Sequence, residues 1–273
     1  MGAALAAGKR VRVALRLTSG NQFGMDSENL KRAVAEKGSY EGVDIVAIHY
    51  YSGTQKKKLA VVEKELAELE ELADTLEERF GLSGISLEYG PGLPADYFGD
   101  DPEGRDMAVL AEAGAMIAAV AARRSVTVEF GRFLASPCGT YLTAAADIKN
   151  NNGENFVICD GGINHLKYYG QTMAMQTPPI TLLGDHGEKT EDYTLCGSLC
   201  TTADILVRKV TLPALSVGDV LAFGRCGAYS VTEGIGLFLS RQLPRIVLHS
   251  ERGGNRLLRD FYGTDILNSP AEV

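Results

Sequence analysis

Four clusters of polar residues and glycines follow predicted apolar strands, and they contain side chains that could bind a ligand or hold a proton. The clusters are Arg16–Gly24 (RLTSGNQFG), His49–Gln55 (HYYSGTQ), Tyr89–Leu93 (YGPGL) and Glu129–Arg132 (EFGR). In parallel α/β folds, ligand sites form at the carboxyl ends of the strands. Each cluster alone also has a plain interpretation, since YGPGL is compatible with a simple turn and Tyr50–Tyr51 with packing.

Glu129 is the most informative of these residues because it follows a continuous apolar run, SVTVEF. An unpaired carboxylate inside a buried strand is costly and needs a cationic partner. Arg132 is near enough in sequence to be that partner. A structural ion pair and a functional carboxylate are both compatible with the pattern.

The elements that would position these clusters alternate between strand and helix over residues 1–135, which is the pattern of a parallel sheet with crossover helices. Val43–Tyr50 is nearly all apolar and is expected to be buried on both faces. Ser27 is the expected N-cap of the first helix. The expected strands are Val11–Leu17, Val43–Tyr50, Ile85–Tyr89 and Ser125–Phe130, and the expected helices are Ser27–Lys37, Lys56–Phe80 and Met107–Arg123.

Two helices are predicted in more detail. In Lys56–Phe80, apolar residues recur at steps of three and four, Gly81 ends the helix, and the glutamates between Glu63 and Glu78 form a solvated face. The run Met107–Ala122 is shorter than the roughly 20 residues of a membrane span and contains Glu112, so it predicts a buried helix.

Residues 136–273 are expected to form a separate β domain. Short β-rich runs alternate there with glycine and asparagine turns such as Asn150–Gly153. The runs are Gly139–Ile148, Phe156–Cys159, Thr194–Gly197, Ile205–Leu212 and Val220–Phe223.

Composition excludes several classes of protein. The 273 residues are 45% hydrophobic and 23% charged, as in a globular protein, and the net charge of −8 leaves no basic surface for nucleic acid. The five cysteines lack CxxC spacing, which predicts neither a disulfide framework nor a metal site. No secretory signal is visible, so a cytoplasmic protein without membrane partners is expected.

Taken in order, the motifs resemble the pyridoxal-phosphate-dependent amino acid decarboxylases of the ornithine, diaminopimelate and arginine type. The resemblance covers nearly the whole chain and rests on RLTSGNQFGMD, AIHYYSGTQ, LEYGPGL, VEFGRFLASPCGTYLTAAADIK, VICDGGINHL, LCGSLCTTADIL and VGDVLAFGRCGAYS. It implies the alanine-racemase-like fold, in which a (β/α)8 barrel holds pyridoxal 5'-phosphate and a β-barrel or sandwich domain completes the site of a two-fold partner. This chain would contain the C-terminal half of the barrel followed by the β domain.

The resemblance implies roles for residues at the ring and phosphate of the cofactor. Glu129 would pair with the pyridine nitrogen and keep it protonated. Gly90 and Gly92 match the phosphate loop of the family, although Pro91 between them removes one N–H donor. Arg132 would support the phosphate site, and Tyr229 would offer its hydroxyl to a phosphate oxygen.

A second motif of the family aligns with His49–Gln55. His49 takes the place of the first histidine of that motif. Tyr51 replaces the second histidine, which stacks on the cofactor ring, so an aromatic face is retained. Thr54 takes the place of the phosphate-binding serine.

The resemblance also implies catalytic residues in the β domain. Cys200 and Asp204 match a C-x-x-x-D motif that enters the site of the neighbouring subunit, with Cys200 as the candidate acid. Thr201 replaces an acidic residue that meets the distal amine of ornithine or diaminopimelate, and the sequence after DGGINHL lacks an arginine–proline pair of the family. These departures argue against ornithine and diaminopimelate as substrates. The CTxxD pattern, Gly170–Gln171 and Phe238–Ser240 are more similar to the branch of the family that acts on larger, conjugated or carrier-tethered amino acids.

The Schiff-base lysine of the family, in a Y-x-x-K-A-N-like segment, has no counterpart in this sequence. We therefore expect a homodimer and, in addition, a first barrel half that a separate polypeptide supplies or that is missing from this sequence, because four strands cannot close a barrel. The alternatives are a non-catalytic homologue that binds partners or cofactor, and a truncated product without its own function. Retention of Glu129, Arg132, Cys200, Asp204 and Tyr229 favours the enzyme.

Overall fold

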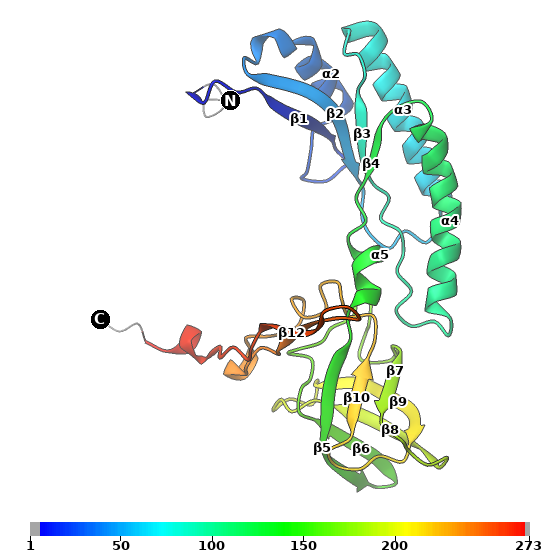
Figure 1. The fold of residues 1–273 in the computed structure, drawn as a ribbon, viewed down its shortest axis with the longest axis vertical. Helices are drawn as coiled ribbons and strands as arrows, with labels where there is room; N and C mark the ends of the chain where they lie inside the picture. Colours follow the sequence, from blue (N-terminus) through cyan, green and yellow to red (C-terminus); the bar gives the residue numbers. More distant parts are fainter. Residues whose placement is uncertain (1–5, 271–273) are drawn as a thin grey trace. The chain divides into compact units, whose positions relative to one another are not determined.

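In the computed structural model, residues 6–270 are described, and the chain forms two compact units (Figure 1). The first unit contains the residues up to 96 together with 101–133, and the second contains 97–100 and the residues from 134 onward. The first unit is α/β, whereas the second consists almost entirely of strands and short 3-10 turns.

Four parallel strands form the sheet of the first unit, in the order β1–β2–β3–β4. Each strand pairs with the next strand along the chain, since a helical connection returns the chain to the same end of the sheet. The predicted parallel sheet is therefore confirmed. Its strands are β1 (Val11–Leu17), β2 (Val43–Tyr51), β3 (Ser86–Gly90) and β4 (Val126–Val128).

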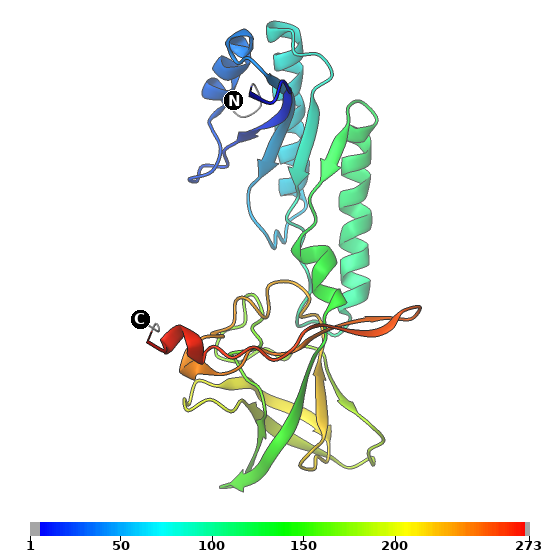
Figure 2. The ribbon, with the colours of Figure 1, turned by 60° about the vertical axis from the view of Figure 1, so that its left-hand side comes forward.

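Helices pack on one face of this sheet, as the two views in Figures 1 and 2 show. Side chains such as Leu69 and Leu76 of α3 form one core with Ile48, Leu87 and Tyr89 of the strands. Gly81 ends α3 in the left-handed conformation, as the sequence predicts. The helices are α2 (Ser27–Ala35), α3 (Ala60–Phe80), α4 (Pro102–Ala121) and α5 (Arg132–Ala135).

The structure corrects three predictions about these helices. The N-cap of α2 is Asp26, whose Oδ1 accepts a hydrogen bond of 2.7 Å from the backbone N–H of Asn29, so Ser27 is already inside the helix. Helix α3 begins at Ala60, which leaves Lys56 in the preceding loop. Helix α4 is not buried: only Asp106, Ala113, Ile117 and Val120 are buried on it, because alanines, which make its sequence apolar, tolerate solvent. Among residues 6–270, no helix is long and apolar enough to cross a membrane.

The prediction that β2 is buried on both faces is also wrong. Only Ala47 and Ile48 of the strand are buried. Because successive side chains alternate between the faces, Ile48 and Tyr50 point toward the helices, whereas His49 and Tyr51 belong to the opposite face. That opposite face is the one that carries polar residues.

The second unit contains a six-stranded sheet in the order β7–β10–β5–β6–β8–β9, and the predicted turn at Asn150–Gly153 joins β5 to β6. Asn152 and Gly153 both have positive φ there, at 55° and 88°, as a tight hairpin requires. The strands are β5 (Tyr141–Asn151), β6 (Glu154–Cys159), β7 (Ile180–Leu183), β8 (Thr190–Cys196), β9 (Ile205–Pro213) and β10 (Val220–Phe223).

The five predicted β runs are confirmed, and three strands were not predicted. Strand β7 is only four residues long, and β11 (Ile246–Ser250) and β12 (Gly254–Arg259) form a separate two-stranded sheet. The pattern of β11–β12 gives no clean alternation, since the side chains of both strands are largely exposed.

Candidate functional site

Four of the predicted site residues lie on one face of the parallel sheet, at the carboxyl ends of its strands: His49, Tyr51, Gly90 and Glu129. Strand register places Arg16 beside His49, and Tyr51 beside Gly90. The Nε2 atom of His49 lies 3.2 Å from Oε2 of Glu129, although 80 residues separate the two in sequence. The helices cover the other face, so this polar face is where a ligand can meet histidine, tyrosine and carboxylate together.

Glu129 is not the buried carboxylate that the sequence predicts. Strand β4 ends at Val128, and the Glu129 side chain is 52% exposed. Its backbone N–H donates to the carbonyl of Tyr89 at 3.0 Å, which fixes the residue at the end of the sheet. A carboxylate held by one histidine and open to solvent can accept a further hydrogen bond from a ligand.

Arg132 follows three residues later, in the short helix α5. It is buried, with 9% of its surface exposed. A buried positive charge of this kind needs polar partners.

The loop after β2 is joined to the loop after β3 along its length. The backbone N–H of Lys56 donates to the carbonyl of Gly92 at 3.0 Å, and the Gln55 side chain bonds both the N–H and the carbonyl of Ala95, at 2.6 and 3.0 Å. Gly92 has a φ of 62°, and a Cβ there would lie 1.9 Å from the carbonyl oxygen of Gly53. The need for glycine at 92 is therefore explained by loop packing. Thr54 lies between these contacts.

Glycine is also required at position 90, for a different contact. A Cβ on Gly90 would lie 2.7 Å from Cδ2 of Tyr51, so the bare glycine lets the Tyr51 ring lie against β3. The ring is thereby held on the polar face of the sheet.

A buried carboxylate, Glu65 of α3, lies behind the loop on the helix side and was not found from the sequence. It accepts hydrogen bonds from the Ser52 hydroxyl at 2.5 Å, the Lys56 ammonium at 2.7 Å and the Tyr89 hydroxyl at 2.6 Å. Burial and the adjacent carboxylate raise the pKa of Tyr89 well above its usual range, so the hydroxyl stays protonated and donates.

The prediction that the glutamates of α3 form only a solvated face is therefore wrong for Glu65. The sequence did contain a signal, because Glu65 stands three residues after Val62 and four before Leu69, in the middle of the apolar stripe. A charge at such a position needs a buried partner, and Lys56 provides it.

In the second unit, Asp204 organises the loop that carries Cys200. Asp204 is 3% exposed, and its two oxygens accept backbone hydrogen bonds from Ile163 at 2.8 Å and from Leu199 at 2.7 Å. A Cβ on Gly162 or Gly197 would lie 2.3 or 2.2 Å from those oxygens. Cys200 itself is exposed on the same loop, so a reactant can reach its thiol.

Tyr229 also belongs to the second unit. It is 51% exposed and has a φ of 63°, in the left-handed region that L-residues seldom adopt. The structure therefore divides the predicted site residues between the two units, with His49, Tyr51, Thr54, Gly90, Gly92, Glu129 and Arg132 in the first, and Cys200, Asp204 and Tyr229 in the second.

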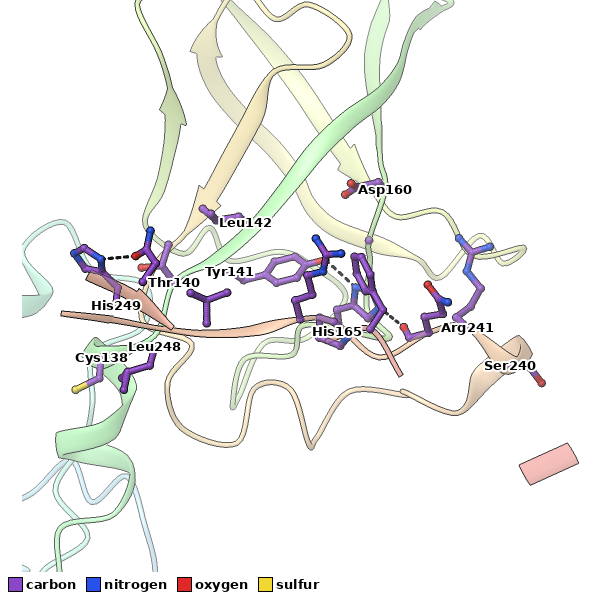
Figure 3. A pocket seen from close by; sticks show the side chains of 17 residues that line it. Cys138, Thr140, Tyr141, Leu142, Asp160, His165, Ser240, Arg241, Leu248 and His249 are labelled. Carbon is purple, nitrogen blue, oxygen red and sulfur yellow. Dashed lines mark hydrogen bonds between the residues drawn. The ribbon is translucent and has the colours of Figure 1, made fainter. Parts of the chain in front are cut away.

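The second unit also holds a cavity of about 1260 Å³ between β5 and the segment that follows residue 240 (Figure 3). Across it, the Tyr141 hydroxyl bonds Nδ1 of His165 at 3.0 Å, and Nε2 of His165 bonds the carbonyl of Gln242 at 2.8 Å. Burial lowers the pKa of His165, so the ring is neutral and its Nδ1 accepts from the tyrosine. None of the predicted site residues lines this cavity, and within residues 6–270 no three His, Cys, Asp or Glu side chains are grouped so that they could hold a metal ion.

Comparison with known families agrees with this fold. The family described as pyridoxal-dependent decarboxylase, C-terminal sheet domain, matches residues 49–227, which is more than half of the chain. The chain therefore belongs to the family of pyridoxal-dependent decarboxylases of the ornithine, diaminopimelate and arginine type.

Among curated proteins, the chain is 28% identical over 249 residues to the L-glutamyl-[BtrI acyl-carrier protein] decarboxylase of Niallia circulans, covering 87% of this chain and 58% of that protein. It is also 28% identical over 212 residues to the diaminopimelate decarboxylase of Archaeoglobus fulgidus, covering 77% of this chain and 50% of that protein. The chain thus spans between half and three fifths of these relatives.

Among solved structures, the diaminopimelate decarboxylase of M. jannaschii in complex with L-lysine superposes with a TM-score of 0.80. The sequences are 24% identical, and the match covers all of this chain and 66% of that one. This similarity shows the fold, which is the predicted one: strand–helix repeats of a barrel followed by a β domain.

Pyridoxal phosphate is the cofactor of this family, and the residues of the first unit fit it in part. The polar face offers a carboxylate for a pyridinium nitrogen in Glu129 and an aromatic ring for stacking in Tyr51, and the loop after β2 contains a hydroxyl suited to a phosphate in Thr54. The glycine loop fits less well. Pro91 has no N–H, and the carbonyl of Gly53 occupies the space beside Gly92.

Proposed function

We propose that this chain contributes to the active site of a pyridoxal-phosphate-dependent decarboxylase that acts on an amino acid or amino acid conjugate. It would supply the residues that bind the pyridine ring and the phosphate group of the cofactor, and the residue that donates a proton. The observation that carries the proposal is the contact between His49 and Glu129, at 3.2 Å, on the polar face of the sheet. It brings two distant motifs together where parallel sheets bind ligands.

When bound, pyridoxal phosphate supplies an electron-accepting ring that draws off the electron pair of the breaking carbon–carbon bond. Glu129 holds a proton on the ring nitrogen, because a carboxylate favours the charged pyridinium. His49 orients that carboxylate through Nε2.

Other residues of the chain bind and orient. Tyr51 stacks on the ring, and Thr54, Arg132 and Tyr229 hold the phosphate group. A hydroxyl, a guanidinium and a phenol are suitable donors for phosphate oxygens.

Cys200 delivers the proton that replaces the lost carboxyl group. Its thiol is exposed on a loop whose shape is fixed by Asp204, which acts as a positioning residue and not as an acid. As in the family, Cys200 would act in the site of a two-fold related copy of the chain, which makes the active form a homodimer.

The lysine that binds the cofactor covalently would come from outside these 273 residues, in a segment with the preceding strands of the barrel. The sequence contains eleven lysines, and Lys56, near the strand ends, is 10% exposed and paired with Glu65 at 2.7 Å. Its ammonium is therefore unsuited to attack an aldehyde.

The substrate class is supported by the names of the relatives. One acts on a glutamyl group carried by an acyl-carrier protein, and a relative from Staphylococcus aureus, 31% identical over 130 residues, is a 2-[(L-alanin-3-ylcarbamoyl)methyl]-2-hydroxybutanedioate decarboxylase. With Thr201 where ornithine-type enzymes have an acidic residue, we propose a conjugated or carrier-tethered amino acid.

Glu129→Gln tests this proposal in the chain combined with a polypeptide that carries the first barrel half and its lysine. We expect decarboxylation to fall by about 100-fold or more, because an amide cannot hold the ring proton, while affinity for the cofactor changes little. Glu71→Gln, which makes the same change at an exposed position of α3, is the matched control. If the Glu129 variant melts much earlier than the parent yet turns over normally when folded, Glu129 is structural and the proposed chemistry is wrong.

A further inference from the structure

The loop Ser52–Lys56 is attached at both ends to a single buried carboxylate. The first residue of the loop, Ser52, donates its hydroxyl to Oε1 of Glu65 at 2.5 Å, and the last, Lys56, donates its ammonium to Oε2 at 2.7 Å. Both charged side chains are buried, with 10% of Lys56 and 7% of Glu65 exposed. The ion pair is therefore formed away from solvent, where losing one partner is costly.

The third group on Glu65 comes from the sheet itself. The Tyr89 hydroxyl bonds Oε2 at 2.6 Å, and the Lys56 ammonium lies 5.8 Å from the centre of the Tyr89 ring. Helix α3, strand β3 and the loop after β2 are therefore joined at one point. Since Tyr89 is fully buried, this point is a fixed reference for the loop.

Two residues assigned to the proposed site, Tyr51 and Thr54, are adjacent to or within this loop. Tyr51 precedes Ser52 directly, and Thr54 lies two residues before Lys56. The loop also packs against Gly92 and is joined to it by the Lys56 N–H. A displacement of Ser52 or Lys56 would therefore move the Thr54 hydroxyl and the Tyr51 ring together.

We propose that Glu65 and Lys56 are positioning residues, which hold the loop so that Thr54 and Tyr51 meet the phosphate and the ring of the cofactor. This inference rests on the proposed function, because it assigns those two residues to pyridoxal phosphate. Glu65 and Lys56 would act through Tyr51 and Thr54, and would themselves contact neither the cofactor nor the substrate. The ion pair uses its charge to fix a backbone conformation.

Pyridoxine 5'-phosphate is the suitable probe, because it has the ring and the phosphate but no aldehyde to react with surface lysines. Its binding to the chain is followed by ³¹P NMR titration. We expect Glu65→Gln to weaken binding about tenfold, which corresponds to about 1.4 kcal/mol. Glu71→Gln is the control, since it makes the same change at an exposed position of the same helix and should bind like the parent.

The double variant Glu65→Gln/Lys56→Met separates positioning from a purely structural role. It removes both charges, so no unpaired charge stays buried, and its melting temperature should return toward that of the parent. Affinity for the probe should stay low because the loop is no longer attached. If affinity recovers together with stability, the pair only stabilises the fold and the positioning role is wrong.

The amide hydrogen exchange of Lys56 gives a readout that needs no ligand. Its N–H is bonded to Gly92, and it should exchange faster in Glu65→Gln and in the double variant but not in Glu71→Gln. Unchanged exchange overturns the proposal. If the parent chain binds no pyridoxine phosphate, the proposed function fails and this inference with it, whereas equal binding by the parent and Glu65→Gln contradicts the positioning alone.

Discussion

Two buried carboxylates, Glu65 in the first unit and Asp204 in the second, each hold a loop that carries predicted site residues, but they do so with different partners. Glu65 binds side chains: a hydroxyl, an ammonium and a phenol. Asp204 binds the backbone N–H groups of Ile163 and Leu199. The first arrangement depends on residue types at three positions, whereas the second depends on the path of the chain.

This difference explains why a sequence motif identifies Asp204 as a site residue but did not identify Glu65. Backbone donors do not change with residue type, and glycines at 162 and 197 leave room for the Asp204 carboxylate. The motif that identified Asp204 is the C-x-x-x-D pattern that it forms with Cys200. The partners of Glu65 come from two segments, the loop after β2 and strand β3, and they form no single sequence motif. A motif search therefore finds a site such as that of Asp204, whereas the partners of Glu65 are identified from the structure.

The largest effect is expected from Asp204→Ala. The variant leaves the N–H groups of Ile163 and Leu199 buried without an acceptor, which should lower the free energy of unfolding by about 3–5 kcal/mol. Urea denaturation followed by circular dichroism measures the change, and Asp185→Ala, at an exposed acidic residue, is the control. An Asp204 variant as stable as the control would show that its loop is held by other contacts.

A smaller effect is expected from Tyr89→Phe, which removes one donor from Glu65 and leaves its ion pair with Lys56. The loss should be about 1–2 kcal/mol, the cost of one hydrogen bond to a charged group. Tyr40→Phe removes a hydroxyl that bonds Glu36 near the surface and should change the melting temperature little. If both variants melt alike, the ion pair alone holds the cluster.

The smallest effect on stability is expected from the protonation of His165 as the pH is lowered. Burial lowers its pKa below the ordinary value of 6.5. As the pH falls below 6.5, the unfolded chain takes up a proton that the folded chain resists, so the stability of the second unit should decrease between pH 7 and 5.5. In His165→Gln, the fall in melting temperature between pH 7 and 5.5 should be smaller than in the parent, whereas His249→Gln should behave like the parent.

Much of the fold follows from hydrophobic periodicity. Strands β1 and β10 have the predicted bounds, and α3 ends at the predicted Gly81. The short strand β7 and the hairpin β11–β12 were not predicted because four-residue or exposed strands carry too little periodic signal. The cap of α2 and the burial of α4 were wrong because both depend on tertiary surroundings that the local pattern does not describe.

The sequence predicts that the site residues lie at the ends of the strands, but it does not predict their contacts or their exposure. Alternation and order were enough to bring His49, Tyr51 and Glu129 to one end of the sheet. The exposure of Glu129 could not be predicted, because it depends on β4 ending at Val128, two residues before the predicted end at Phe130. The role of Gly92 was equally hidden, since its close contact with Gly53 comes from a different loop.

Tyr229 places stability and ligand binding in direct competition. At its φ of 63°, an L-residue carries a cost of about 1–2 kcal/mol that glycine would not. The same backbone conformation would therefore be more stable with glycine at 229. Selection for thermal stability alone would favour Tyr229→Gly, which removes the phenol. In an engineering programme for this protein, position 229 should be held fixed, because the change that most relaxes the chain there also removes a proposed phosphate ligand.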